Sequence, residues 1–414
     1  MEDRKTRVAI THGDTNGTGY ELIFKTFSDP AMLELCTPII YGSPKIATYH
    51  RNALNMQANF TIISKAEEAR EGKTNMLTSF EDDVKVELGT VAKEAGTAAM
   101  KALERALNDS ETGVYDALVT LPMNKKNMDE TFTGQTSHIA EAVGNGQKPL
   151  VIYVNDTMRV ALATTHVAVK DIAALISQDF VEDRIKVFHQ SLKRDFLLTN
   201  PRIAVLALNP QTIDGQSAGQ EEDTIIEPAI KSLEAQKIQA YGPYAADEFF
   251  GKGIYEMFDG VLAMYDDQGL APFRTLDNGE GYCITAGLPI VRTSPATIAP
   301  FDTAGQGTAD ESSFRHAIFA AIDIARNRCF YDEGNRNPLP KLYHEKRDDS
   351  EKVRFNIPKK HENKSENKQT GKQEDNGQQK QPKSGGFWLL RVNFSGSSQA
   401  RISLLTGQTA LPPS

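Results

Sequence analysis

Short apolar runs alternate with longer amphipathic stretches along most of the chain. Five runs rich in valine, isoleucine and leucine predict buried strands, at residues 7–11 (RVAIT), 117–121 (ALVTL), 159–165 (RVALATT), 203–208 (IAVLAL) and 260–265 (GVLAMY). Amphipathic stretches between or after them predict helices, among them residues 91–107, 180–192 and 312–325. Strands that alternate with helices are typical of an α/β fold with a largely parallel sheet.

The composition changes near Leu342. Residues 344–383 are dominated by Lys, Glu, Asn, Gln and Asp, a composition that cannot bury enough apolar surface to order itself. Two apolar pieces follow, residues 387–394 and 401–405, which form either a hairpin or the apolar end of a disordered tail. We expect residues 343–414 to be a low-complexity, disordered polar tail outside the α/β fold.

Composition and charge narrow the class of protein. The 414 residues are 39% hydrophobic and 24% charged, which is typical of a globular chain of one large or two smaller domains. A formal net charge of −9 argues against a surface for nucleic acid or anionic membrane, and the first apolar segment is too short for a signal peptide or membrane span. Three scattered cysteines fit a reducing compartment. We expect a cytoplasmic protein with neither nucleic acid nor membrane as a partner.

Four of the predicted strands end in polar residues. Asn124 and Lys125 follow the strand at 117–121, His166 follows that at 159–165, Gln211 that at 203–208 and Asp266 that at 260–265. Ligands of open α/β sheets bind outside the carboxyl ends of the strands, so we expect these four exits to share one site. A lone histidine after a strand, such as His166, is more often a structural hydrogen-bonding residue, so the prediction depends on the whole set.

Two glycine-containing loops precede predicted helices. In the first, residues 12–21, Leu22 takes the place of the third glycine of a dinucleotide-binding motif, so a structural turn is at least as good an interpretation. The second, residues 302–310, includes Asp302 and Gly305 and forms either a dinucleotide site or an ordinary helix entry. Arg292 follows another short apolar run, where its guanidinium would hold a phosphate or form a surface ion pair.

Nine short segments together resemble a known family. They read ITHGDTNGTGYE, LVTLPMNKK, FTGQTSH, RVALATTH, RIAVLALNPQ, GPYAADEFF, VLAMYDDQGL, TAGLPIVRTS and FDTAGQGTADESSF. Their order and spacing resemble the 4-hydroxythreonine-4-phosphate dehydrogenase family over residues 7–342. The resemblance implies the fold of isocitrate and isopropylmalate dehydrogenases, with two α/β subdomains flanking an active-site cleft and a homodimer that completes each site. We expect one dehydrogenase domain at residues 1–342, with residues 1–130 and 296–342 as subdomain one and 131–295 as subdomain two.

The resemblance also implies an activity. The family uses NAD or NADP and a divalent metal to oxidise the C3 hydroxyl of 4-phosphooxy-L-threonine. The resulting 3-keto acid loses carbon dioxide and gives 3-amino-2-oxopropyl phosphate, in the biosynthesis of pyridoxal phosphate. Two alternatives stay open: a dehydrogenase of a different phosphorylated hydroxy acid, and a catalytically weak homologue that binds a metabolite.

The functional positions of the family carry over unevenly. Its three metal-binding histidines fall here on His166, Gln211 and Asp266. Its substrate-binding His, Thr, Lys, Asn and Arg fall on Gln135, Thr136, Arg274, Cys283 and Arg292. The resemblance further implies catalytic roles for His166, Asp247 and Lys125, and the second glycine-containing loop is the expected place for cofactor binding, by Asp302 and Gly305.

These departures change the expected chemistry. One imidazole combined with a carboxylate and an amide oxygen favours Mg or Mn over Zn or Co. Arg274 keeps a cation where the family has lysine. Cys283 cannot reproduce the paired donor and acceptor of asparagine, so we expect one hydrogen bond to the substrate to be lost.

Overall fold

The computed structural model describes residues 4–80, 84–128, 132–211, 215, 217–297 and 300–337. The chain divides into two units, Met1–Lys341 and Leu342–Ser414, and all described residues belong to the first. The predicted tail lies outside the described residues, and the division of the first unit into two subdomains stays a prediction. Within the described part of the chain, none of the helices has the length and apolarity needed to cross a membrane.

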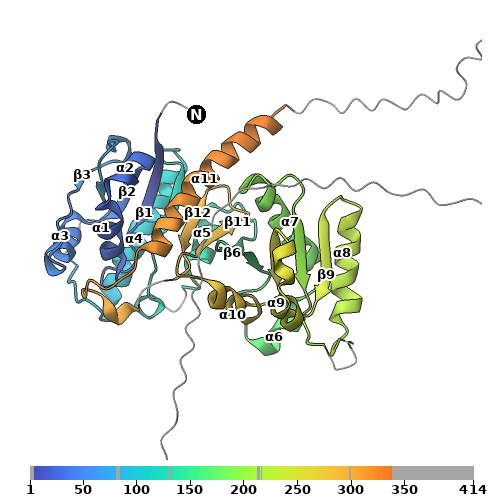
Figure 1. The fold of residues 1–414 in the computed structure, drawn as a ribbon. Coiled ribbons are helices and arrows are strands. Elements are labelled where there is room, and N and C mark those ends of the chain that lie inside the picture. The colour runs from blue at the N-terminus through green and yellow to red at the C-terminus, as the bar shows by residue number, and fades with distance from the viewer. Residues whose placement is uncertain are drawn as a thin grey trace, which may run out of the picture. The chain divides into compact units, whose positions relative to one another are not determined.

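A 12-stranded sheet runs through the first unit, in the order β3-β4-β2-β1-β5-β12-β11-β6-β7-β10-β8-β9 (Figure 1). Its strands are β1 Thr6–Thr11, β2 Cys36–Gly42, β3 Thr61–Ile63, β4 Asn75–Thr78, β5 Ala117–Thr120, β6 Leu150–Val154, β7 Arg159–Leu162, β8 Arg202–Leu206, β9 Gln239–Tyr244, β10 Gly260–Ala263, β11 Tyr282–Ala286 and β12 Arg292–Pro295. The five predicted strands are confirmed as β1, β5, β7, β8 and β10, although β7 ends three residues, and β8 and β10 end two residues, earlier than the apolar runs suggest.

The two halves of the sheet point in opposite directions. The strands from β3 to β12 are parallel to one another, and so are those from β7 to β9. Between them, the pairs β12–β11, β11–β6 and β6–β7 are antiparallel. Because these three pairs each reverse the strand direction, the carboxyl end of β5 lies at the opposite end of the strands from the carboxyl ends of β7, β10 and β8. The polar exit of β5 therefore lies at the opposite end of the strands from the other three exits, and a site shared by all four stays a prediction.

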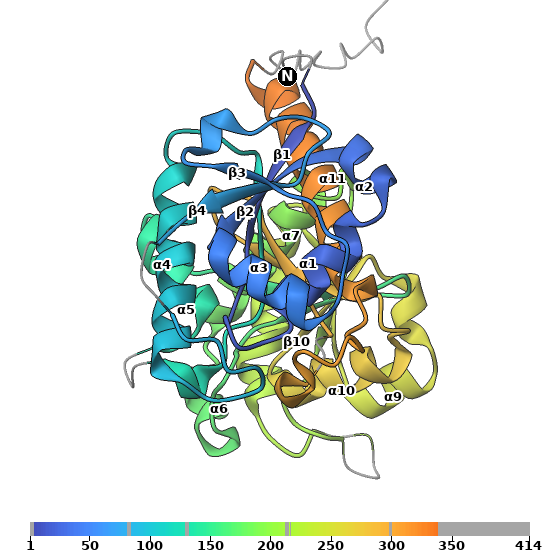
Figure 2. The same ribbon diagram turned by 90° about the vertical axis from the view of Figure 1, so that its left-hand side faces the viewer.

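Helices cover both faces of the sheet. They are α1 Gly19–Phe27, α2 Pro30–Leu35, α3 Pro44–Ala53, α4 Lys93–Ser110, α5 Gln135–Val143, α6 Val169–Leu175, α7 Gln178–Arg194, α8 Glu227–Glu234, α9 Ala246–Gly251, α10 Asp266–Leu276 and α11 Ser312–Asn335. Figure 2 shows α4 on one side of the β1 and β2 strands and α11 on the other. Helix α4 packs on β1 and β2, and α10 packs on β7 and β10.

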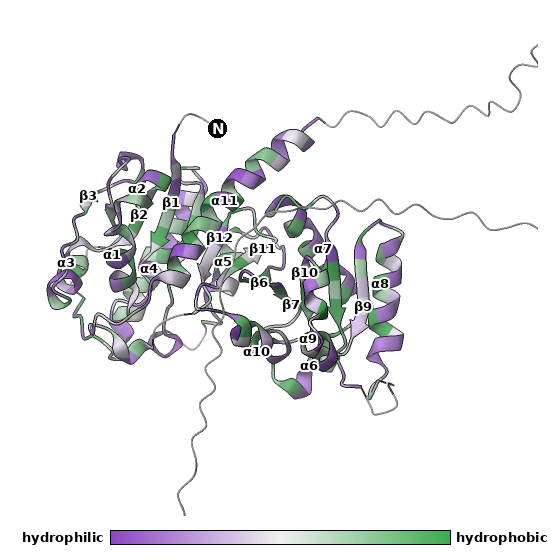
Figure 3. Ribbon diagram, in the orientation of Figure 1, coloured by the Kyte–Doolittle hydropathy of each residue, from purple (hydrophilic) through white to green (hydrophobic). Residues whose placement is uncertain are grey.

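The amphipathic pattern explains how the long helices form and pack. In α7, buried Val181, Ile185, Phe188 and Leu192 recur every three or four residues and make one apolar stripe that packs on the sheet. The hydroxyl of Ser177 accepts a hydrogen bond from the Phe180 amide and fixes the start of this helix. Figure 3 shows the consequence: hydrophobic residues gather along the strands, whereas the helices carry both kinds of residue.

Candidate active site

Polar side chains gather on one face of the sheet, between α5 and α10. Residues paired across neighbouring strands point to the same side, as do alternate residues of one strand. Tyr153 of β6 pairs with Cys283 of β11, and Cys283 pairs with Ser294 of β12. Arg292 lies two residues before Ser294 and therefore shares this face. We call Tyr153, Cys283, Ser294 and Arg292 the polar floor.

The Arg292 guanidinium is buried in this floor, with only 6% of the residue exposed. Its Nε and Nη2 donate to Thr120 Oγ1 at 3.1 and 2.7 Å, and its Nη1 donates to Thr285 Oγ1 at 3.0 Å. None of the described carboxylates forms an ion pair with it. Burial lowers the Arg292 pKa, and the neighbouring Cys283 and Tyr153 partly offset this effect.

A buried guanidinium without a counter-ion indicates an anion-binding site. Arginine stays protonated in proteins, so burying it unpaired costs free energy unless a ligand supplies the opposite charge. The alternative of a surface ion pair for Arg292 is wrong, because the side chain is buried and its partners are threonine hydroxyls.

The start of α5 brings two predicted residues, Gln135 and Thr136, to this guanidinium. Arg292 Nη1 lies 3.4 Å from Thr136 Oγ1 and its Nη2 lies 3.4 Å from Gln135 Oε1. The Gln135 amide also donates to the Leu121 carbonyl at 2.9 Å, which ties the helix to the end of β5. Lys125 is exposed nearby: a β-carbon built on Gly134 would lie 4.0 Å from Lys125 Cε.

Helix α10 crosses the other side of the floor. A β-carbon on Gly269 would lie 2.8 Å from side-chain atoms of Leu162 and Val160, so this helix packs closely on β7. The helix begins at Asp266 and carries Arg274 in its last turn. At 1.5 Å per residue these two positions are about 12 Å apart along the helix. Asp266 thus lies at the carboxyl ends of β7, β10 and β8, and Arg274 lies toward the other ends of these strands.

The three predicted metal ligands follow three neighbouring strands. The His166 amide donates to Asp266 Oδ2 at 2.7 Å, and the His166 side chain is exposed. Gln211 is also exposed and forms an isolated bridge with Ser217. Among the described residues, no three His, Cys, Asp or Glu side chains gather closely enough to hold a metal ion. The chain therefore offers one imidazole, one carboxylate and one amide at this edge.

The predicted cofactor loop packs against the first glycine loop, where Glu21 Oε1 accepts a hydrogen bond from the Ala309 amide at 2.8 Å. Gly305 has a φ of 84°, and a β-carbon there would lie 2.5 Å from the Leu88 side chain, so this position favours glycine. Lys25 of α1 donates to the carbonyls of Gly307 and Ala309 at 2.9 and 2.5 Å. The two loops thus form one surface near the start of α11. Asp302 lies in the short helical turn Phe301–Thr303 of this surface.

Asp247 is separate from these groups. It is exposed in the first turn of α9, after β9, the strand next to β8. Within the described part of the chain, no hydrogen bond or ion pair joins Asp247 to another predicted site residue. Its catalytic role stays a prediction.

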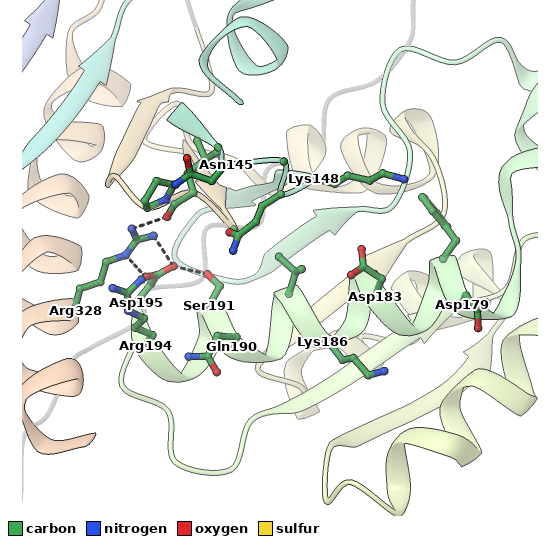
Figure 4. A pocket seen from close by; sticks show the side chains of 18 of the residues that line it. Asn145, Lys148, Asp179, Asp183, Lys186, Gln190, Ser191, Arg194, Asp195 and Arg328 are labelled. Carbon is green, nitrogen blue, oxygen red and sulfur yellow. Dashed lines mark hydrogen bonds and ion pairs between the residues drawn. The ribbon is translucent and has the colours of Figure 1, made fainter. Parts of the chain in front are cut away.

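A cavity of about 1150 Å³ lies beside α7, away from all the predicted residues (Figure 4). Its charged lining is largely paired. Arg328 Nε lies 2.6 Å from Asp195 Oδ1, and Asp195 Oδ2 accepts from Ser191 Oγ at 2.6 Å. Arg194 pairs with Asp332 at 2.5 Å. These contacts hold α11 against the end of α7, so we assign the charges around this cavity a structural role.

Besides Ser294 of the polar floor, sequence reasoning missed three residues of the site: Tyr153, Thr120 and Thr285. Each is a hydroxyl residue within an apolar strand, at a position that would otherwise carry an aliphatic side chain. That pattern is a usable signal, but it does not say which face of the strand the hydroxyl occupies.

Comparisons with known proteins agree with this architecture. The sequence profile described as pyridoxal phosphate biosynthetic protein PdxA matches residues 34–321. The 4-hydroxythreonine-4-phosphate dehydrogenase of Bacteroides thetaiotaomicron is 52% identical over 358 residues, covering 86% of this chain and 98% of that protein. The enzyme of the same name from Prosthecochloris aestuarii is 37% identical and covers 77% of this chain and 97% of its own length.

Solved structures show the same fold. The 4-hydroxythreonine-4-phosphate dehydrogenase of Klebsiella pneumoniae superimposes with a TM-score of 0.68 at 28% identity, covering 78% of this chain and 99% of that one. The enzyme from Burkholderia phymatum gives a TM-score of 0.64 at the same identity and coverage. The resemblance and the α/β fold class inferred from the nine segments are confirmed. This chain belongs to the family of pyridoxal phosphate biosynthetic proteins PdxA.

Proposed function

We propose that this chain is a 4-hydroxythreonine-4-phosphate dehydrogenase, which oxidises the C3 hydroxyl of 4-phosphooxy-L-threonine with NAD or NADP in pyridoxal phosphate biosynthesis. The observation that carries the proposal is the buried, unpaired guanidinium of Arg292, which faces Gln135 and Thr136. The relatives with this printed name match the chain over most of its length. A phosphorylated substrate supplies the anion that the site lacks.

Substrate binding follows from the two guanidinium groups. Thr120 and Thr285 orient the Arg292 fork, which suits a phosphate or carboxylate held by two hydrogen bonds. Arg274, at the end of α10, supplies a second cation on the same face of the sheet. Binding an anion there offsets the cost of burying Arg292, and it leaves the rest of the substrate directed along the polar floor.

His166, Asp266 and Gln211 would hold the divalent metal, and the loop with Asp302 and Gly305 would hold the nucleotide. Asp266 Oδ2 already accepts a hydrogen bond from the His166 backbone amide, so few protein ligands are left for a metal ion. Such a sparse set fits a hard ion that keeps water or substrate oxygens as its other ligands, such as Mg or Mn. When bound, the metal lowers the pKa of the substrate hydroxyl and stabilises the charge left by decarboxylation, and NAD(P) accepts the hydride. The catalytic roles of His166, Lys125 and Asp247 remain proposals.

The direct test is metal-dependent NADH formation. The protein is stripped with a chelator, one metal is restored at a time, and NADH absorbance is followed with 4-phosphooxy-L-threonine. We expect turnover with Mg or Mn to exceed turnover with Zn or Co. Turnover of another phosphorylated hydroxy acid alone would instead assign a different substrate. No turnover with any metal would favour a metabolite-binding homologue.

We further propose a homodimer whose metal site draws on both chains. The support is the sparse set of His166, Asp266 and Gln211 that one described chain offers at this edge. Sedimentation velocity on the active protein tests this proposal. A fully active monomer would contradict it.

A further inference from the structure

The phenol of Tyr153 lies at the end of the polar floor that α10 covers. Its position on β6 places it directly across from Cys283, and the Phe273 ring of α10 packs edge-on against it, with ring centroids 5.5 Å apart and an interplanar angle of 62°. The residue is half-buried. Its hydroxyl forms no hydrogen bond with the side chains or backbone of the described residues, so it is available to a ligand.

The charges around this phenol come from both ends of the site. Burial is the main cause that raises the Tyr153 pKa, and the nearby Cys283 and Asp266 raise it further. The positive charges of Arg274 and Arg292 lower it in part. The hydroxyl is therefore within electrostatic reach of the anion-binding Arg292 and of Asp266 at the metal edge. At neutral pH it stays protonated, so it offers one donor and an acceptor.

Cys283 leaves a gap in hydrogen bonding that Tyr153 is placed to fill. The family resemblance puts an asparagine amide at position 283, with a paired donor and acceptor. Burial raises the Cys283 pKa, so the side chain stays a neutral thiol, which is a weak donor. Since Tyr153 and Cys283 are cross-strand partners, their functional groups face the same space above the sheet.

We infer that Tyr153 is a substrate-binding residue whose hydroxyl bonds the middle of the substrate, between the anionic group at Arg292 and the hydroxyl near Asp266. It supplies the contact that Cys283 cannot make. This inference rests on the proposed function and adds a specificity-determining residue to the same site. A substrate with a polar group at that place gains from the phenol, whereas an analogue lacking the group would leave the hydroxyl unpaired.

Replacing Tyr153 by phenylalanine tests the inference. Tyr153→Phe removes only the hydroxyl and keeps the packing on Phe273. We expect KM for 4-phosphooxy-L-threonine to rise about 10-fold, equivalent to about 1.4 kcal/mol, while KM for NAD(P) and the melting temperature stay unchanged. The matched control is Tyr282→Phe: Tyr282 is half-buried on β11 beside Cys283 but points to the opposite face, so its kinetics should match the wild type.

A second variant tests the compensation itself. Adding Cys283→Asn to Tyr153→Phe should restore KM to within a few-fold of the wild type, which a merely structural role of the phenol would not allow. Unchanged KM in Tyr153→Phe, or a persistent defect in the folded double variant, would overturn the inference and leave the proposed function standing. A wild-type protein that does not oxidise the substrate would overturn the proposed function, and this inference with it.

Discussion

The Arg292 side chain shows how much one residue contributes to substrate recognition. Its planar fork bonds two threonine hydroxyls and still faces the start of α5. A lysine ammonium cannot reproduce this geometry, so we predict that Arg292→Lys lowers kcat/KM about 100-fold, mainly through KM. Steady-state kinetics would check this. Arg202→Lys, at an exposed position at the start of β8, is the control and should change neither parameter. An unchanged KM in Arg292→Lys would show that the anion binds elsewhere.

Residue identity should also set the choice of metal. Gln211→His would add an imidazole to His166 and Asp266, so we predict a shift of preference from Mg or Mn toward Zn or Co. Asp266→Ala should nearly abolish turnover, and His166→Ala should be at least as damaging. Metal restoration after chelation measures all three. Gln236→His, at an exposed position just after α8, is the matched control and should leave the preference unchanged. Activity that resists both chelator and Asp266→Ala would refute the metal site.

At the scale of elements, α10 connects the two ends of the site. Gly269 lets it approach β7 and β10, because a β-carbon there would come within 2.9 Å of Leu162, Val160 and Ala263. We predict that Gly269→Ala costs about 1–3 kcal/mol of stability through overpacking. It should also lower kcat/KM, because the shifted helix moves Asp266 and Arg274 relative to the floor.

Thermal unfolding and kinetics measure both effects. The control is Gly251→Ala at the end of α9, where an added β-carbon would meet no atom within 4 Å. That variant should keep full activity, with stability unchanged or raised by up to about 1 kcal/mol. Equal behaviour of the two variants would mean that the close packing of α10 has no functional consequence.

For the molecule as a whole, two buried histidines predict the pH dependence of stability. The His12 ring stacks on Tyr20 and the His50 ring lies tilted against it, each with its centroid 4.9 Å from that of Tyr20. A ring nitrogen of His12 bonds the Tyr41 carbonyl, and one of His50 bonds the Thr15 carbonyl. Burial is the main cause that lowers both pKa values from 6.5 to about 4. The unfolded chain therefore binds more protons than the folded one between about pH 4 and 6.5, so stability falls as the pH falls through this window.

The expected loss between pH 7 and pH 5 is about 2 kcal/mol for each histidine. Urea unfolding at the two pH values measures it. His50→Gln, which keeps a donor for the Thr15 carbonyl, should remove about half of the dependence. Asp14 acts in the opposite direction, because burial raises its pKa. A free energy of unfolding that does not change between pH 7 and 5 would contradict the burial of these neutral imidazoles.

The tail gives a prediction for the whole chain that comes from composition alone. Removing residues 343–414 should leave the melting temperature and turnover unchanged, because a segment so rich in polar residues contributes no core. Comparison of the 1–342 chain with the full chain tests this. An insoluble or inactive short form would show that the tail packs on the enzyme.

The sequence by itself determined the fold class, five of the strands, the main helices and the family. These are encoded locally: the period of apolar residues distinguishes strand from helix, and the order of short segments identifies relatives. Strands β3 and β12 were not predicted, because β3 has only three residues and β12, with the sequence RTSP, has no aliphatic run. The apolar strand β6 was also missed, although its sequence LVIYV is typical of a buried strand.

Only the tertiary structure decided how the pieces meet. Because β11 and β6 pair antiparallel with their neighbours, β5 and β7 run in opposite directions. Lys125, after β5, therefore lies at the opposite end of the strands from His166, Asp266 and Gln211, which follow β7, β10 and β8. The same strands bury Arg292 instead of leaving it in a surface ion pair, and they turn Tyr153 toward Cys283. Strand direction and register arise from pairings between segments far apart in the chain. A shift of one residue would move every side chain to the opposite face, so local pattern cannot specify them.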